Sequence, residues 1–299
     1  LATAYALVRD GVEVTLVEAR QDLGGEASFA NGGQLSYRYV APLADAGVPL
    51  QALGWMLRAD SPLKLRPRLD PAQWRWMGAF LAACRTSVNR QNAAHLLRLA
   101  LLSQRTLSDW REEDLLGDFH WRRNGKLVTF RDAYSFERAR HALIEPQQQL
   151  VLSDTECASL EPALARRELV GGIYTPEEEV GDCHAFCQQL LARLQASRSC
   201  TLRLGQAVTG LRHAGGVVQA IELGDEVLAV EHLVIAAGHR SPLLRLPGVQ
   251  MPLYPLKGYS LTVPIGPQHR APQLSITDND RKIVYARLGQ QLRVAAMVD

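Results

Sequence analysis

The sequence lacks the features that would mark it as a membrane-spanning or nucleic-acid-binding protein. No apolar run approaches the roughly 20 residues that a helix needs to cross a bilayer, and no secretory signal is visible, although a lost N-terminus could have carried one. The net charge of +2 does not favour a nucleic-acid partner. With 47% hydrophobic and 21% charged residues, the composition is that of an ordinary soluble globular protein.

Several catalytic motifs are also missing. There is no HExxH, no GxSxG and no P-loop, which disfavours metalloprotease, α/β-hydrolase and NTPase chemistry. The five cysteines have no framework spacing, which favours reduced thiols in a cytosolic compartment. Cys183 and Cys187 flank His184 on an expected helix, but no second Cys or His pair completes a tetrahedral set. We expect buried structural thiols and no metal.

The chain opens inside a helical pattern. Small and apolar residues recur at helical spacing over 1–8, Asp10 and Gly11 end the helix, and the alternating run VEVTLVE from Val12 ends on Glu18. This reads as the helix and second strand of a βαβ unit of about 30 residues, whose glycine-rich start would precede the helix. A carboxylate at Glu18 is where such a unit binds a ribose hydroxyl. Any α/β protein can end a strand on Glu by chance, so both readings stay open.

The remaining chain is long enough, at 299 residues, for two domains. The glycine-rich run DLGGEASFANGGQLS, residues 22–36, predicts either a close approach of backbone to a ligand or a flexible loop. A helical insertion follows, with one strand at GKLVTF. After residue 179 we expect a helix and an antiparallel meander from CTLRL to HLVIAAG, whose last strand is apolar enough for a central buried position. The final part is strand-rich.

A basic stretch lies within the insertion. Residues 51–90 contain seven Lys or Arg and two Asp or Glu, interleaved with Trp55, Trp74 and Trp76. Such a pattern predicts either a surface that rests on a membrane or a solvated helix face over a tryptophan core.

Taken in order, these runs resemble the FAD-dependent D-amino-acid oxidase superfamily, and within it the bacterial D-amino-acid dehydrogenase small subunits. The matching runs are LATAYALVRDGVEVTLVEA, SFANGGQLS, YVAPLADAGVPLQALGWML, GDCHAFCQQLLARL, VIAAGHRS and YPLKGYSLTVPI. The resemblance covers nearly all of the chain. The family's N-terminal glycine fingerprint and C-terminal glycine-rich turn have no counterpart in the sequence, so we expect both ends to be cut.

The resemblance implies a mixed α/β (α+β) fold with a discontinuous, Rossmann-like FAD-binding domain and an inserted substrate domain of sheet and helices. The FAD-binding segments would be 1–48 and 151–245, and the substrate segments 49–150 and 246–299. On this model Glu18 holds the adenosine ribose and Val208 bonds adenine through its backbone. The implied FAD-binding residues are Glu18, Arg20, Ala27, Ser28, Asn31, Gly32, Gly33, Gln34, Val208, Ala237 and Gly238.

The implied reaction is oxidative deamination of a D-amino acid, with electrons passed to a quinone or another carrier. The substrate carboxylate needs a cation, and Arg287 is the candidate, although a solvated strand arginine is the alternative. Tyr259 and Lys257 are expected to border flavin and substrate. The expected location is the cytoplasm, with peripheral contact to the cytoplasmic face of the inner membrane. The competing interpretations are a glycine or sarcosine type oxidase that uses oxygen, a nicotinamide-dependent dehydrogenase and a non-catalytic flavin-binding subunit.

Overall fold

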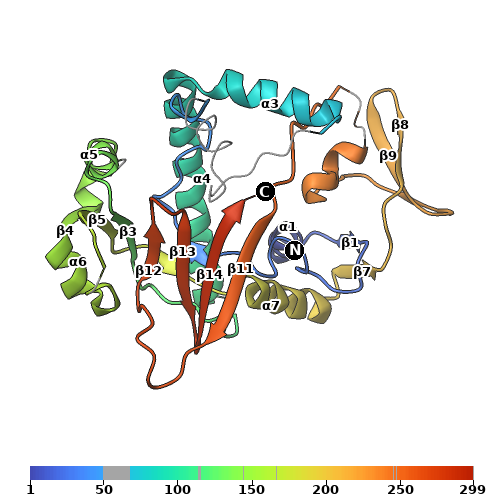
Figure 1. The fold of residues 1–299 in the computed structure, drawn as a ribbon. Coiled ribbons are helices and arrows are strands. Elements are labelled where there is room, and N and C mark those ends of the chain that lie inside the picture. The colour runs from blue at the N-terminus through green and yellow to red at the C-terminus, as the bar shows by residue number, and fades with distance from the viewer. Residues whose placement is uncertain are drawn as a thin grey trace. The chain divides into compact units, whose positions relative to one another are not determined.

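A computed structural model describes residues 1–49, 68–113, 116–143, 145–165, 167–244, 246 and 248–298. The chain forms two compact units, each built from separate segments (Figure 1). Unit 1 contains residues 1–28, 68–79 and 187–255. Unit 2 contains the described residues of 29–67, 80–186 and 256–299. The chain therefore passes from one unit to the other several times.

Unit 1 contains the helix and strand that the first residues predict. Helix α1 (Ala2–Arg9) ends at Asp10, and strand β1 (Val14–Glu18) follows. Gly11 has a φ of +81°, a left-handed conformation that glycine adopts without strain, so the helix ends where the sequence predicts. Strand β7 (Cys200–Leu204) pairs with β1 in parallel, and Glu18 lies opposite Leu204.

The predicted meander is only partly correct. Strands β8 (Gly210–Ala214), β9 (Val217–Leu223) and β10 (Glu226–Ala229) form a three-stranded antiparallel sheet, but β7 belongs to the sheet with β1. The run HLVIAAG forms no strand, and Val234 within it is 58% exposed. A strand needs a neighbour to satisfy its backbone, and no described strand pairs with this run. A 3₁₀ helix, η3, follows at Gly238–Leu244.

Unit 2 contains a seven-stranded sheet in the order β11-β14-β13-β12-β3-β5-β4. All neighbouring strands are antiparallel except β3 and β12, which are parallel. Figure 1 shows β12, β13, β14 and β11 side by side. The strands, in chain order, are β3 (Lys126–Phe130), β4 (Leu150–Ser153), β5 (Gly171–Thr175), β11 (Gly258–Pro264), β12 (Ser275–Asp278), β13 (Ile283–Leu288) and β14 (Gln291–Val298).

This sheet divides the sequence differently from the predicted domain boundaries. The sequence places residues 151–245 in one segment, whereas β4 and β5 pair in the same sheet as residues 258–298, and residues 187–255 belong to unit 1. Pairing between strands far apart in the chain leaves no mark in local periodicity. The predicted correspondence of these segments to a cofactor domain and a substrate domain stays a prediction.

The helices and the minor sheet of unit 2 follow local sequence signals. Helix α6 begins with a capping box in which Ser153 and Glu156 bond each other's backbone N–H groups. Helices α3 and α7 contain residues of both units. The described helices that lie wholly or partly in unit 2, with the two strands of its minor sheet, are α3 (Pro71–Ala83), α4 (Thr86–Glu113), α5 (Ala133–His141), η1 (Pro146–Gln148), α6 (Asp154–Leu160), η2 (Pro162–Leu164), α7 (Cys183–Ala196), β2 (Gln34–Leu35) and β6 (Glu179–Val180).

Apolar side chains cover both faces of the sheet. One cluster contains Val128, Phe130 and Ile173 of the sheet with Phe136 of α5. A second cluster contains Leu127 and Ile276 with Cys157 of α6. Because neighbouring residues of a strand point to opposite faces, α5 and α6 pack on opposite faces of β3. A third cluster, Val180, Ala286 and Leu288, lies near the segment described below.

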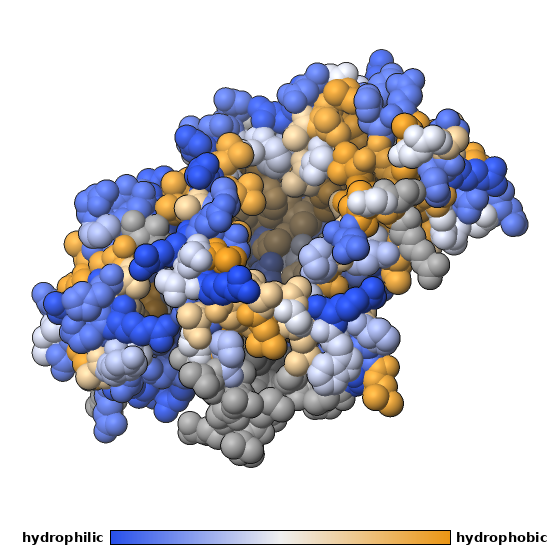
Figure 2. Space-filling model, turned by 90° about the horizontal axis from the view of Figure 1, so that it is seen from above, coloured by the Kyte–Doolittle hydropathy of each residue, from blue (hydrophilic) through white to orange (hydrophobic). Residues whose placement is uncertain are grey.

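The predicted membrane surface is only partly within the described chain. Trp55 and its neighbours up to residue 67 lie outside the described residues. Trp74 is 51% exposed on α3, where its indole N–H donates to the carbonyl of Arg68. The face in Figure 2 shows hydrophobic and hydrophilic residues interspersed. Among the helices of the described residues, we find none with the length and apolarity that a transmembrane span requires.

Candidate functional site

The segment Asn31–Ser36 crosses one face of the unit 2 sheet. A Cβ added to Gly32 would lie 3.0 Å from a methyl carbon of Val284. At Gly33, where φ is +68°, a Cβ would lie 3.3 Å from a methyl carbon of Leu288. The two glycines therefore allow the backbone to approach β13 more closely than other residues would.

Gln34 anchors the middle of this segment. Its Nε2 donates to the carbonyl oxygens of Ile276, at 2.9 Å, and Tyr285, at 3.0 Å. Its Oε1 accepts from the hydroxyl of Thr277 at 3.2 Å. The amide of Gln34 thus bonds β12 and β13 at once, which fixes its orientation.

Arg293 of β14 lies at the first end of the segment and is 7% exposed. Its guanidinium donates to the Thr262 hydroxyl at 3.1 Å and to the Asn31 carbonyl oxygen at 3.4 Å. It also lies 3.5 Å from a carboxylate oxygen of Asp182, which accepts the N–H groups at the start of α7. The sequence does not reveal this residue, because an arginine alternating with apolar residues in a strand usually points to solvent.

Lys126 of β3 lies at the second end and is 3% exposed. Its Nζ is 2.8 Å from the Ser36 hydroxyl oxygen and 3.9 Å from the centre of the Tyr39 ring. Burial lowers the pKa of Lys126 to about 7, and attraction to Glu178 partly opposes that shift. This amine is therefore close to losing its proton near neutral pH.

Glu178 is the carboxylate that faces this amine, and it is 1% exposed. One oxygen accepts the backbone N–H of Arg38 at 2.8 Å, and the other is buried without a hydrogen-bond partner among the described residues. Burial raises the pKa of Glu178, while the N–H of Arg38 and the charge of Lys126 oppose that shift. The neighbouring Glu179 accepts the hydroxyl of Tyr37 at 2.8 Å, and burial is the main cause that raises the pKa of Tyr37. The stretch after Gln34 is thus tied to both β3 and the β6 region.

Two of the predicted catalytic residues, Arg287 and Tyr259, lie on the other face of the sheet. Ala286 pairs with Arg293, so Arg287, the next residue, points to the opposite face and pairs with Leu292. The carbonyl oxygen of Arg287 accepts from Arg122 at 2.9 Å, and burial followed by repulsion from Arg287 lowers the pKa of Arg122.

Tyr259 is 44% exposed and shares the face of Arg287, while its neighbour Ser260 bonds the Ala30 carbonyl on the face of the segment. Lys257 places its Nζ 5.0 Å from the Tyr259 ring centre. Tyr259 pairs with Ala296, four positions along β14 from the partner of Arg287, or about 13 Å. The structure therefore brings Lys257 and Tyr259 together but brings neither Arg287 nor Tyr259 to Asn31–Gln34.

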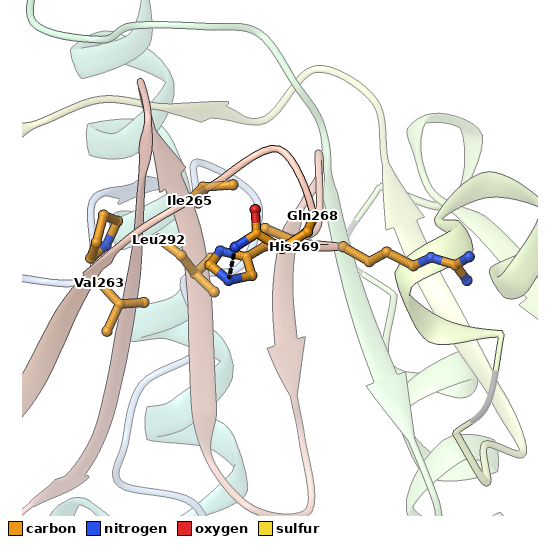
Figure 3. A pocket seen from close by; sticks show the side chains of 8 residues that line it. Val263, Ile265, Gln268, His269 and Leu292 are labelled. Atoms are coloured by element: carbon orange, nitrogen blue, oxygen red, sulfur yellow. Dashed lines mark hydrogen bonds between the residues drawn. The ribbon is translucent and has the colours of Figure 1, made fainter.

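A hollow of about 480 Å³ lies at the β11–β14 end of the same unit. Figure 3 shows Gln268 and His269 beside Leu292 and Val263. None of the residues that the sequence singles out lines this hollow. It is therefore not the predicted site.

Unit 1 contains the remaining predicted residues. The Glu18 carboxylate accepts the N–H of Arg20 at 2.9 Å, and the Glu18 carbonyl accepts the N–H of Gln206 at 3.0 Å. This second bond brings the loop that contains Val208 to the end of β1. The side-chain oxygen of Gln206 is buried and has no hydrogen-bond partner within the described chain. That oxygen is placed to accept from a bound group.

A salt bridge brings a third segment of unit 1 to this place. Glu26 lies 3.5 Å from Arg20 and 3.3 Å from Arg240 of η3. This contact links the chain before Ala27 and Ser28 to the helix that begins at Gly238, just after Ala237. Within the described residues, no group of three His, Cys, Asp or Glu side chains is arranged to hold a metal ion.

The comparison with known families decides the class of protein. The family model for FAD dependent oxidoreductases (DAO) matches residues 1–299. The chain belongs to this family. Two named members of the family are similar to this chain along its whole length. The chain is 67% identical over 299 residues to D-amino acid dehydrogenase 2 of Pseudomonas aeruginosa, covering 100% of this chain and 72% of that protein. A second protein of the same name, from Ralstonia nicotianae, is 44% identical over 315 residues, with 100% and 73% covered.

Solved structures of other members confirm the predicted mixed α/β fold. Glycine oxidase from Geobacillus kaustophilus superposes with a TM-score of 0.66 at 18% identity, covering 100% of this chain and 68% of that chain. Iminodiacetate oxidase from Chelativorans gives a TM-score of 0.65 at 19% identity, with 100% and 68% covered. At these identities the likeness concerns the fold. The predicted family and its cofactor, FAD, are confirmed, while the individual site residues stay predictions.

The described residues of this oxidoreductase offer a buried acceptor for part of the cofactor in unit 1. In unit 1, Glu18 stands at the end of a parallel strand beside the unpartnered oxygen of Gln206, which suits a nucleoside. In unit 2, a Cβ on Gly32 or Gly33 would press on Val284 or Leu288 of β13, so these glycines allow the segment to pack closely on the sheet. The predicted FAD-binding residues are divided between the two units.

Proposed function

We propose that the protein oxidises D-amino acids to 2-oxo acids and ammonia. The observation that carries this proposal is the 67% identity, over the whole chain, to a protein named D-amino acid dehydrogenase 2. The dehydrogenase removes two electrons and a proton from a Cα that bears an amine and a carboxylate. The flavin, when bound, accepts the two electrons. When the amine is neutral, the Cα–H bond can break by hydride transfer without a side-chain acid or base, and water then hydrolyses the imino acid to the 2-oxo acid and ammonia.

The chain's own residues then have to hold and orient the reactants. Glu18 is proposed to bind the adenosine ribose, with Arg20, Ala27, Ser28, Val208, Ala237 and Gly238 along the rest of the nucleotide. Asn31–Gln34 are proposed to pass beside the flavin ring. The close packing of Gly32 and Gly33 on β13 and the anchoring of Gln34 give this segment one fixed course.

The substrate carboxylate needs a cation, and the sequence predicts Arg287. However, Arg287 points away from the face that carries Asn31–Gln34, and β13 lies inside the sheet, where the two faces do not meet. The predicted carboxylate ligand, Arg287, and the segment predicted to pass beside the flavin, Asn31–Gln34, therefore lie on opposite faces of the sheet. Tyr259 and Lys257 share this difficulty, since Tyr259 lies on the face of Arg287.

For the second half-reaction we propose a quinone or another carrier as the electron acceptor, reached by peripheral contact with the cytoplasmic face of the inner membrane. The basic, tryptophan-bearing sequence over 51–90 supports this contact. Full-length protein should then sediment with anionic vesicles at low salt. Protein that stays in the supernatant would contradict the membrane contact.

The proposed reaction is tested by flavin absorbance in the purified full-length protein. We expect the absorption at about 450 nm to bleach when D-alanine is added without oxygen. A yellow protein that keeps its colour with D-alanine and a panel of other amines would refute the substrate class. Hydrogen peroxide formed in air would identify oxygen, instead of a carrier, as the acceptor.

A further inference from the structure

Two buried cations lie in one cross-strand row of the unit 2 sheet. Lys126 pairs with Ser275, and Arg293 pairs with Ala286 and with Thr262. The register of β12 and β13 aligns Ser275 with Ala286, so the row runs through five strands. Side chains of directly opposite residues lie on the same face. Lys126 and Arg293 therefore share one face, although three strand spacings separate them.

The segment Asn31–Ser36 runs between these two cations on that face. Arg293 reaches the carbonyl oxygen of Asn31, and Lys126 reaches the hydroxyl of Ser36. Between them, Gln34 bonds carbonyls of β12 and β13. The segment is thus held at both ends and in the middle, and both end contacts come from side chains that are more than nine-tenths buried.

Placing these two cations in the sheet carries an electrostatic cost that other groups must offset. Burying an ammonium or guanidinium is unfavourable, and apolar residues of similar volume are often equally stabilising at such positions. The charges are balanced instead by carboxylates outside the sheet: Asp182 faces Arg293 and Glu178 faces Lys126. Asp182 also accepts the N–H groups at the start of α7, and Glu178 accepts the N–H of Arg38, just after the segment. Such an arrangement fixes the position of the segments, and the desolvation of the buried charges reduces the stability that it adds.

We infer that Lys126 and Arg293 are positioning residues that fix the segment Asn31–Ser36 on the sheet from its two ends. The further consequence, that they set the backbone beside the flavin, rests on the proposed function. Neither residue need touch the cofactor. Their effect on FAD would pass through the course of the segment that they hold.

The first test is FAD affinity in the full-length protein. Lys126→Met removes the amine that contacts Ser36, and Arg293→Met removes the guanidinium that contacts Thr262, Asn31 and Asp182; both leave an unbranched apolar side chain that is shorter than the original. We expect the dissociation constant of FAD, measured by flavin fluorescence, to rise about tenfold in each. Arg281→Met is the matched control, because the exposed Arg281 side chain gives up its ion pair with Asp278, a carboxylate that keeps its contact with Arg131. Two variants that bind FAD as the wild type does would overturn the inference.

The second test needs neither flavin nor substrate. In FAD-free protein, hydrogen exchange of the backbone amides of Gly33 and Leu35 should be faster in both variants and unchanged in Arg281→Met. Ser36→Ala removes only the acceptor of Lys126, so it keeps the inference testable if Lys126→Met does not fold. We expect faster exchange in Ser36→Ala too, and exchange at the wild-type rate there would refute the Lys126 contact. Arg293→Lys, which keeps the charge, should restore part of the FAD affinity, and no recovery would point to a merely structural role.

These results are separable from the proposed reaction. Wild-type flavin that fails to bleach with D-alanine, while the two variants still lose FAD affinity, would refute only the substrate. Wild-type flavin that bleaches normally, with both variants unchanged in affinity and exchange, would refute only the positioning role.

Discussion

The buried amine of Lys126 should make the stability of this oxidoreductase depend on pH in a defined window. The pKa of Lys126 is lowered from its ordinary value of 10.5 to about 7 in the folded chain. Between these values the unfolded chain binds a proton that the folded chain does not. The free energy of unfolding therefore rises with pH through this window. At pH values below about 7 the buried amine is charged, and the full free-energy cost of burying that charge reduces the stability.

The size of the effect follows from the two pKa values. The cost of the buried amine is about 4 kcal/mol at pH 7 and about 2 kcal/mol at pH 9, so stability should rise by about 2 kcal/mol. Lys126→Met removes the titrating group, so this part of the slope should vanish. The measurement is urea unfolding of both proteins from about pH 6 to pH 9 at fixed saturating FAD, because bound cofactor adds its own stability.

Glu178 provides the internal check. Its charge raises the pKa of Lys126 in the folded chain, so Glu178→Gln should extend the lower edge of the window of rising stability to lower pH, while the upper edge near 10.5 stays in place. Lys126→Met is compared with Lys126 twice, once in the wild-type chain and once in the Glu178→Gln variant. The second comparison is free of the effect of leaving the Glu178 charge without a cation. Equal slopes with and without Lys126, in both backgrounds, would show that the amine is not buried as a titrating group.

Further predictions concern single contacts. Leu127→Ala, at a position with no exposure in the cluster beneath α6, should cost about 2–5 kcal/mol in urea unfolding. Ser153→Ala removes the capping box of α6 and should cost about 1 kcal/mol, while loss of less than about 0.3 kcal/mol would contradict the cap. Gly33→Ala should weaken FAD binding, since its Cβ would press on Leu288 at a positive φ. Arg287→Ala should change KM for D-alanine less than about twofold, because it points to the other face; a rise above about tenfold would restore Arg287 as the carboxylate ligand.

Local features of the fold were predictable because their causes are local. Asp10 and Gly11 end α1, and alternation marks β1. The run HLVIAAG was predicted wrongly as a strand, because an apolar run needs a neighbour that periodicity does not reveal. Pairing of β7 with β1, across almost 200 residues, was missed for the same reason.

The residues of the candidate site were likewise predictable only where their signal is local in the sequence. The glycine pair before Gln34 is visible in the sequence, and its close packing on β13 gives it a physical basis. Lys126 and Arg293 gave no signal, because each stands in an ordinary strand pattern and becomes notable only when the register places both on one face. Arg287 and Arg293 look alike in the sequence and differ by the face to which they point.

The parallel pairing of β3 with β12 has a consequence for synthesis. Residues 126–130 leave the ribosome almost 150 residues before residues 275–278, which become their neighbours. At about 5–20 residues per second, the strand waits on the order of ten seconds or more. In that time β5, itself paired with β4, can pair with one edge of β3, while the other edge presents unpaired backbone. Nascent chains are then open to pairing with one another, so crowded polysomes and fast induction should favour aggregation of this protein over its folding.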